Sequence, residues 1–125
     1  MQRNILIVED HKAVRKTLID WLEGVFPRCD FIEATSGEDA IEICRTIIPD
    51  LILMDISLPR LNGIGTTKRI LSMIPAVRVI MLTIHEEEVY RVESMSAGAS
   101  AFIPKRMMKT ELVPAIEKLL AINSK

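Results

Sequence analysis

The sequence has few aromatic residues and no long apolar run, and each shortage excludes a class of protein. Only 4% of its 125 residues are aromatic, so a core must be built mainly from aliphatic side chains and methionine. No apolar run approaches the roughly 20 residues that a helix needs to cross a bilayer. A secretory signal is not expected either, because the apolar segment within MQRNILIVED is short and has no small-residue cleavage site. The chain is therefore expected to be cytoplasmic, without contact with a membrane.

Cysteines and excess charge are also scarce. Cys29 and Cys44 have neither the spacing of metal ligands nor that of a disulfide framework, and are interpreted as small apolar residues in a reducing compartment. The formal net charge is −1, so the chain lacks the excess of Lys and Arg on which binding to a phosphate backbone depends. Direct binding to nucleic acid is not expected, and any DNA-linked role would belong to another chain or domain.

Short apolar runs rich in branched side chains alternate with stretches of helical spacing. The runs are ILIV (5–8), CDFIEA (29–34), LILM (51–54), VRVIML (77–82) and AFI (101–103). A strand followed by a helix, five times over, favours a parallel sheet covered on both faces. We therefore predict an α/β fold, a flavodoxin-like doubly wound (βα)5 three-layer sandwich with strand order 2-1-3-4-5. The length suits a single domain, residues 1–125.

Two helix ends are predicted from capping residues. Ser36 and Asp39 have the spacing of a capping box at the start of the second helix, whose inward face is expected to include Ile48. Thr110 is expected to cap the last helix, which would place Pro114 in its first turn, where proline is tolerated.

Polar side chains stand where four of the predicted strands end. Glu9 and Asp10 follow the first strand, Asp55 follows the third, Thr83 ends the fourth and Lys105 follows the fifth. In the order 2-1-3-4-5 the first and third strands are neighbours, so three carboxylates converge at the crevice beyond the carboxyl ends of the strands. Packed carboxylates repel one another unless a cation intervenes. Oxygen ligands with open positions suit Mg²⁺, which is the predicted cofactor.

Thr83 and Lys105 would add a hydroxyl donor and an ammonium group at the same edge. Both groups can hold and neutralise phosphoryl oxygens. Asp55 then stands between metal and cation, where a carboxylate can act as a nucleophile toward phosphorus. The residues at this edge therefore indicate phosphoryl transfer.

Four segments, in order along the chain, carry a resemblance to a known family: VED, LILMDISLP followed by NG, MLTIH, and GASAFIPK. Together they resemble the receiver domain of two-component response regulators across essentially the whole chain. The runs EDHKAVR and MLTIHEEE are most similar to the subfamily that carries LuxR/NarL-type helix-turn-helix output domains. Such an output domain is expected to be absent from this chain.

The resemblance implies a role for each polar residue at the predicted sheet edge. By this resemblance Asp55 is the phosphoacceptor, Glu9 and Asp10 are the acidic pair for Mg²⁺, and the backbone carbonyl of Ser57 completes the metal site with them. Three more roles are implied by the resemblance: a hydroxyl switch at Thr83, a phosphate-contacting lysine at Lys105, and an aromatic that changes rotamer on activation at Phe102.

The chain also departs from the family pattern. The family often has proline after its lysine, whereas here Pro104 precedes Lys105 and Arg106 follows it, so the lysine must be aimed in another way. Ser57 and His85 lie two positions past the phosphoacceptor and the hydroxyl switch, where side chains in this family tend to tune the access of water. A changed lifetime of the acyl phosphate is therefore predicted.

The implied function is a phosphorylation-dependent signalling switch. A sensor histidine kinase, a phosphotransfer protein or a small donor such as acetyl phosphate would supply the phosphoryl group. The chain would assist its own phosphorylation and dephosphorylation but would not be an enzyme. The face formed by residues 86–97 and 101–122 is expected to control homodimerisation or a DNA-binding output domain, and so transcription.

Three alternatives share parts of the pattern. An aspartyl-phosphate phosphohydrolase also has a nucleophilic Asp after an apolar strand, but it usually has a second Asp two positions on, where this chain has Ser57. A flavodoxin-like electron carrier needs a Gly-rich phosphate loop and aromatic flavin contacts, and EDHKAV with a single Tyr supplies neither. The third alternative is a receiver-like scaffold that is never phosphorylated.

Overall fold

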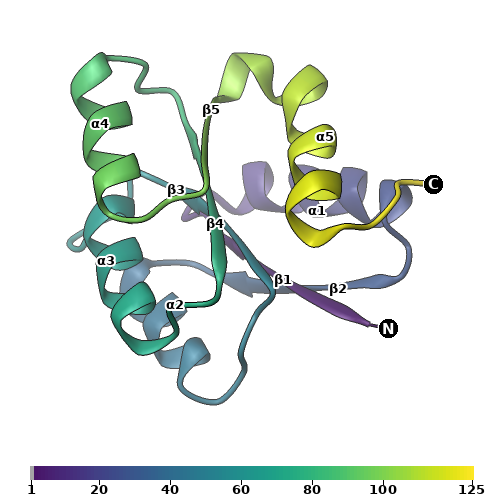
Figure 1. The fold of residues 1–125 in the computed structure, drawn as a ribbon, viewed down its shortest axis with the longest axis horizontal. Helices are drawn as coiled ribbons and strands as arrows, with labels where there is room; N and C mark the ends of the chain where they lie inside the picture. The colour runs from purple at the N-terminus through teal and green to yellow at the C-terminus, as the bar shows by residue number, and fades with distance from the viewer. Residues whose placement is uncertain (1) are drawn as a thin grey trace.

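The computed structural model describes residues 2–125 and consists of a five-stranded parallel sheet between helices (Figure 1). The strands are β1 (Arg3–Val8), β2 (Cys29–Ala34), β3 (Leu51–Asp55), β4 (Arg78–Thr83) and β5 (Ala101–Pro104). The α-helices are α1 (Lys12–Val25), α2 (Gly37–Cys44), α3 (Gly63–Met73), α4 (Glu88–Ser96) and α5 (Met108–Leu120), and the short 3-10 helix η1 (Lys105–Met107) precedes α5. The strand order is β2-β1-β3-β4-β5, which confirms the predicted fold.

The helices form two layers, with α1 and α5 on one face of the sheet and α2, α3 and α4 on the other (Figure 1). Successive residues of a strand point to opposite faces, so the side chains of the central strands pack into two apolar cores, one on each face of the sheet. Ile52 and Met81 pack on the α2–α4 side, whereas Leu53 and Leu82 pack on the α1–α5 side. All five residues of β3 are buried, as expected for a strand covered on both faces. In the described part of the chain, 2–125, no helix combines the length and apolarity that a membrane span requires.

The strand register aligns the carboxyl ends at one edge of the sheet. The cross-strand partners nearest this edge are Val8 with Met54, Asp55 with Leu82, and Thr83 with Pro104. Residues that end or follow β1, β3, β4 and β5 therefore emerge side by side, which is the condition for a shared site.

The start of α2 confirms the predicted cap, but its inward face is shorter than expected. The backbone N–H of Asp39 donates to Ser36 Oγ at 3.0 Å, and the Asp39 carboxylate accepts from the backbone N–H of Thr35. The prediction that Ile48 faces inward is wrong, because α2 ends at Cys44 and leaves Ile48 68% exposed in the segment that leads to β3.

The start of α5 differs from the prediction. The helix begins at Met108 with Met107 as its N-cap residue, so Thr110 lies inside the first turn and donates its hydroxyl to the Met107 carbonyl. Pro114 therefore lies in the second turn, where its ring removes one backbone hydrogen bond of the helix. The sequence pattern missed this start because η1 runs directly into α5 without a polar cap.

Gly63 begins α3 in direct contact with the backbone at the end of β3. A Cβ atom at this position would overlap the carbonyl oxygen of Asp55 and lie 2.9 Å from the Cα of Ile56, and neither atom can move as a flexible side chain can. Gly63→Ala is expected to lower the free energy of unfolding by about 3 kcal/mol, the upper range for overpacking, as measured by urea denaturation.

Gly24→Ala is the matched control for this prediction. Gly24 lies in α1, and an added Cβ would meet nothing within 4 Å. Alanine there should raise the free energy of unfolding by about 0.5–1 kcal/mol. Equal effects of the two substitutions would show that the contact beneath Asp55 is not tight.

Candidate functional site

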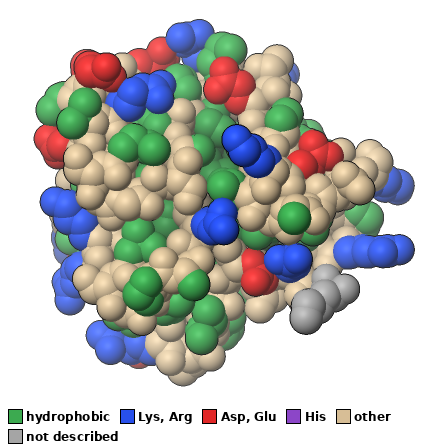
Figure 2. All heavy atoms as spheres, in the orientation of Figure 1, with side chains coloured by type: hydrophobic (Ala, Val, Ile, Leu, Met, Phe, Trp, Pro, Cys, Tyr) green, Lys and Arg blue, Asp and Glu red, His purple; other side chains and the backbone are tan. Residues whose placement is uncertain are grey.

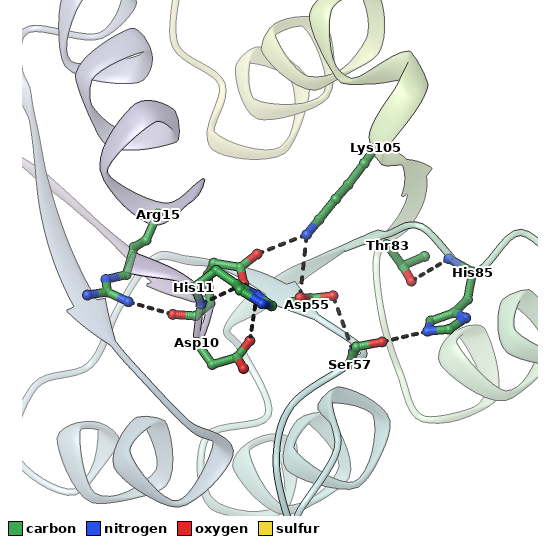
Figure 3. A network of polar contacts seen from close by, with 9 residues as sticks. Asp10, His11, Arg15, Asp55, Ser57, Thr83, His85 and Lys105 are labelled. Carbon is green, nitrogen blue, oxygen red and sulfur yellow. Dashed lines mark hydrogen bonds and ion pairs between the residues drawn. The ribbon is translucent and has the colours of Figure 1, made fainter. Parts of the chain in front are cut away.

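Lys105 lies between two buried carboxylates at the carboxyl edge of the sheet (Figure 3). Its Nζ is 2.9 Å from Glu9 Oε1 and 3.4 Å from Asp55 Oδ2. Glu9 is 3% exposed and Asp55 is 5% exposed. Both carboxylates are shielded from water and would repel each other if ionised. The ammonium group of Lys105 compensates their negative charge. The structure brings together these three residues from the ends of β1, β3 and β5.

Burial and the ammonium group act in opposite directions on the ionisable side chains. Burial is the main influence on Asp55 and raises its pKa, against the attraction of Lys105. Burial would also raise the pKa of Glu9, but hydrogen bonds from Lys105 and from the His11 backbone outweigh it and lower that pKa. Desolvation would lower the pKa of Lys105, but its bonds and attraction to the two carboxylates raise it. Of its two carboxylate partners, Lys105 thus lies closer to Glu9 than to Asp55.

The lowered pKa of Glu9 predicts a pH dependence of stability. The ionised side chain contributes stability above the ordinary glutamate pKa of 4.5, and this contribution is lost as the pH falls through the lowered value. In EDTA, the free energy of unfolding of the wild type should therefore fall more steeply below about pH 4.5 than that of Glu9→Gln. Denaturant unfolding at a series of pH values measures both slopes, and parallel curves would contradict the prediction.

Glu9, Asp10 and His11 form a cluster whose ligand atoms lie within 4.8 Å of one another. His11 Nδ1 is 3.3 Å from Glu9 Oε2 and 3.4 Å from Asp10 Oδ1. Asp10 Oδ1 is buried, and no hydrogen-bond partner for it exists among residues 2–125. A buried carboxylate oxygen that accepts no hydrogen bond, beside a second acidic side chain, is a donor set suited to a hard divalent cation. The residues present therefore fit Mg²⁺, although Asp55 faces Lys105 and lies outside this cluster.

Ser57 and His85 meet across the mouth of the site (Figure 3). Ser57 Oγ and His85 Nε2 lie 2.5 Å apart, at hydrogen-bonding distance. The backbone N–H of Ser57 donates to Asp55 Oδ1 at 3.2 Å, and the backbone N–H of His85 donates to Thr83 Oγ1 at 2.9 Å. The loops that follow β3 and β4 are thus joined beside Asp55. The sequence singled out both positions but gave no sign that their side chains would bond.

The two proposed switch residues are Thr83, the last residue of β4, and Phe102, in β5. Thr83 is fully buried, and its oxygen accepts the His85 N–H, so its own hydroxyl hydrogen is left to donate elsewhere. Phe102 is buried in β5, and the Arg91 guanidinium lies 4.8 Å from its ring centre. The structure therefore shows Phe102 in an inward position. The rotamer change expected of it stays a prediction.

Arg106 links η1 to the loop before α4. Its Nε donates to Glu86 Oε1 at 3.0 Å and Oε2 at 2.9 Å. Lys105 is the first residue of η1, directly after Pro104, and reaches both carboxylates from there. The departure from the usual order of lysine and proline therefore leaves the lysine aimed at Asp55.

Arg15 is a residue of the site that the sequence reasoning missed. It lies in α1, is 8% exposed, and donates from Nη1 to the Glu9 carbonyl oxygen at 2.8 Å and from Nε to Glu33 Oε1 at 2.7 Å. An arginine in an amphipathic helix usually indicates a solvated face. The available signal was Glu33 near the end of β2, because the predicted strand order places β2 beside β1.

Comparison with known proteins identifies a family model and relatives that match the chain. Residues 5–117 match the response regulator receiver domain. The chain is 37% identical over 116 residues to the response regulator UvrY of Escherichia coli (strain K12), covering 93% of this chain and 53% of UvrY. It is 32% identical over 114 residues to the transcriptional regulatory protein DegU of Brevibacillus brevis, covering 90% of this chain and 48% of DegU. The chain thus spans about half the length of the curated relatives it matches.

Solved structures give the same result. A two-component response regulator of the LuxR family from Aurantimonas sp. SI85-9A1 has a TM-score of 0.89 and 30% identity to the chain, over 98% of this chain and 89% of that one. The similarity extends over the whole sheet and both helical layers.

Proposed function

Because the chain belongs to the receiver domain family of response regulators, we propose that it is a phosphorylation-dependent switch with Asp55 as the phosphoacceptor and residues 1–125 as one receiver domain. The observation that carries the proposal is the buried Asp55 carboxylate at the end of β3, 3.4 Å from the Lys105 ammonium. An ionised oxygen is the nucleophile that phosphoryl transfer needs, and a fixed cation stabilises the charge that shifts during transfer.

Transfer would place the phosphoryl group between the side chains that already surround Asp55. A carboxylate oxygen of Asp55 attacks phosphorus, and the bond from phosphorus to the donor nitrogen or oxygen breaks with its electron pair leaving on the donor. The Lys105 ammonium and the free hydroxyl hydrogen of Thr83 then contact phosphoryl oxygens. Mg²⁺ held by Glu9, Asp10, Asp55 and the backbone carbonyl of Ser57 would supply further positive charge. The domain itself thus assists both transfer and later hydrolysis.

The output surface proposed for the switch is the face formed by α4, β5 and α5. Val89, Val92 and Met95 on α4 expose large parts of their side chains, and Figure 2 shows hydrophobic side chains over α4 beside charged ones. If the phosphoryl group draws Thr83 toward the site, the loop to α4 must follow, because the His85 N–H is bonded to Thr83. This movement would bias an existing equilibrium of the face. Homodimerisation or a DNA-binding output domain controlling transcription would respond.

The proposed phosphodonor is a sensor histidine kinase or a phosphotransfer protein of the cytoplasm. A groove of about 640 Å³ between α1 and α5 is lined by Ala13, Val14, Thr17, Leu18, Trp21, Met108 and Lys109. Three of these residues also line a small cavity that reaches Asp55 and Lys105. An apolar surface beside the reacting carboxylate supports the docking of a protein donor there.

Incubation with acetyl phosphate tests the proposed function directly. The intact mass should increase by one phosphoryl group when Mg²⁺ is present, and EDTA should prevent the increase. Hydroxylamine should remove the group, because it cleaves acyl phosphates and leaves phosphoserine intact. An adduct that forms equally in EDTA, or that resists hydroxylamine, would count against phosphorylation of an aspartate.

The bond between Ser57 and His85 predicts the direction in which the lifetime of the acyl phosphate changes. The two side chains bond to each other beside Asp55 and are therefore not free to orient a water molecule. His85→Ala should therefore shorten the half-life of the phosphorylated protein several-fold, as followed by intact mass after removal of the donor. Ile48→Ala, at an exposed position before the start of β3 and away from Asp55, serves as a control. An unchanged or longer half-life in His85→Ala would show that the bridge does not restrict water.

A further inference from the structure

We propose that Arg15 is a positioning residue for the Mg²⁺ site, acting through the backbone of the acidic pair and charge-balanced by Glu33. The inference rests on the proposed function in one respect, that Glu9 and Asp10 bind Mg²⁺. Arg15 itself contacts neither the metal position nor Asp55, and its guanidinium points away from them toward β2 (Figure 3).

The first argument is where Arg15 places its hydrogen bonds. Nη1 donates to the carbonyl oxygen of Glu9 at 2.8 Å, and this bond is buried. The Glu9 carbonyl belongs to the peptide group that joins Glu9 to Asp10. A planar guanidinium that also donates from Nε to Glu33 at 2.7 Å has little freedom to rotate. The peptide group that leads into Asp10 is therefore held against α1 and β2.

The second argument is how completely the rest of this turn is paired. The backbone N–H of Glu9 donates to the Ala34 carbonyl at 3.2 Å, and the backbone N–H of His11 donates to Glu9 Oε2 at 3.1 Å. Asp10 Oδ1 is the buried oxygen of the turn without a hydrogen-bond partner among residues 2–125. The turn is thus held by hydrogen bonds at Glu9 and at His11, whereas Asp10 Oδ1 accepts none from the described residues and lies 3.4 Å from His11 Nδ1, which leaves this oxygen able to accept a ligand. Arg15 supplies the bond from the helix side.

The third argument concerns charge. A guanidinium beside a cation site repels the cation unless another charge balances it. Glu33 lies 2.7 Å from the Arg15 Nε, so the pair contributes little net charge at the site. The Glu33 side chain is about half exposed, whereas the Arg15 side chain is buried. Arg15 thus supplies a rigid hydrogen-bond donor, and the net charge of the Arg15–Glu33 pair is close to zero. Such a pair can support a metal site without repelling the cation.

Mg²⁺ affinity measured by calorimetry in the absence of a phosphodonor tests this inference. Arg15→Met should raise the dissociation constant by about tenfold, as the loss of outer-shell partners does at metal sites. Arg15→Lys should raise it less, because an ammonium can replace one of the two bonds. Arg45→Met is the matched control, because Arg45 is an exposed arginine at the end of a helix and is paired with Glu42. The Mg²⁺ affinity of Arg45→Met should equal that of the wild type.

A double-mutant cycle separates positioning from a general effect on the fold. If Arg15 acts through Asp10, then Arg15→Met should weaken Mg²⁺ binding little further in an Asp10→Asn background. Equal losses in both backgrounds would overturn the inference, and so would a wild-type affinity in Arg15→Met. Unfolding in EDTA checks that the variants are folded.

If Arg15→Met does not fold, the variant Glu33→Gln provides a second test of the inference. It leaves the guanidinium charge unbalanced, so its Mg²⁺ affinity should fall several-fold at low salt and recover at high salt. An affinity equal to that of the wild type in both Glu33→Gln and Arg15→Lys would overturn the inference. A wild type that binds no Mg²⁺ would instead remove the metal role of the acidic pair, and the inference with it.

Discussion

Replacing Asp55 by asparagine is expected to abolish the phosphoryl adduct while leaving the fold intact. The amide has the shape of the carboxylate but lacks the charged oxygen that attacks phosphorus, so the loss should be complete within the detection of intact mass after incubation with acetyl phosphate and Mg²⁺. Labelling of Asp55→Asn to the extent of the wild type would refute the assignment of the phosphoacceptor.

The same substitution should also raise the stability of the metal-free protein at neutral pH. The pKa of Asp55 is raised because the carboxyl group is buried. A raised carboxyl pKa means that the folded state loses stability as the pH rises through that pKa, so ionised Asp55 destabilises the fold at pH 7. Asparagine removes this penalty. The gain over the wild type should disappear below the ordinary aspartate pKa of 3.8, where the wild-type carboxyl is protonated in both states.

Asp50→Asn is the matched control for both effects. Asp50 directly precedes β3, at the opposite edge of the sheet, where its Oδ2 accepts the backbone N–H of Asn4 at 2.8 Å. This variant should be phosphorylated like the wild type and should not gain stability. A lost adduct in Asp50→Asn would indicate that the assay reports the integrity of β3 and not the chemistry of Asp55.

Removing the ammonium group by Lys105→Met should give the largest loss of stability among substitutions at the site. Breaking a buried ion pair usually costs about 3–5 kcal/mol, because the remaining charge is left without a partner. Here two carboxylates lose their shared cation, but Lys105 is partly exposed and a carboxyl can take up a proton instead. We expect a fall of about 2 kcal/mol in the free energy of unfolding at pH 7 in EDTA.

The pH dependence identifies the origin of this loss. Lys105 contributes to lowering the pKa of both Glu9 and Asp55, so both values should rise in Lys105→Met. The difference in unfolding free energy from the wild type should therefore shrink as the pH falls and the carboxyls become protonated. Lys68→Met, at an exposed position in α3, should change stability little at any pH. A loss that does not depend on pH would point to packing of the lysine stem and not to its charge.

The elements that the sequence predicted well are those fixed by local pattern. The apolar runs that include Leu53 and Met81 become strands buried on both faces, and the alternation of strands and helices yields the predicted order. The strand order in turn places Glu9, Asp55 and Lys105 together, because parallel strands end at one edge. The site could be assembled from sequence since it depends on topology more than on side-chain detail.

The features that could not be predicted depend on contacts between distant segments. The sequence shows charges at Glu9 and Lys105 but not that their bond would be shorter than that between Lys105 and Asp55. Likewise, nothing local indicates that His85 would reach Ser57 from another loop. The start of α5 was predicted wrongly for a related reason. Thr110 has the residue type of a cap, but the sequence does not show that η1 leads directly into α5.

The ion pair between Lys105 and Glu9 makes loading of the site an exchange of cations. For any divalent ion that approaches these carboxylates, the ammonium group is a competitor attached to the same molecule, and its effective concentration is high. A divalent ion held by Glu9 would have to displace this internal counter-charge. The metal affinity of the site would therefore be lower than the carboxylates alone would give, and Lys105 would again neutralise the buried carboxylates when the metal leaves. Asp55, the proposed nucleophile, would likewise keep the Lys105 ammonium as its counter-charge whenever no metal is bound.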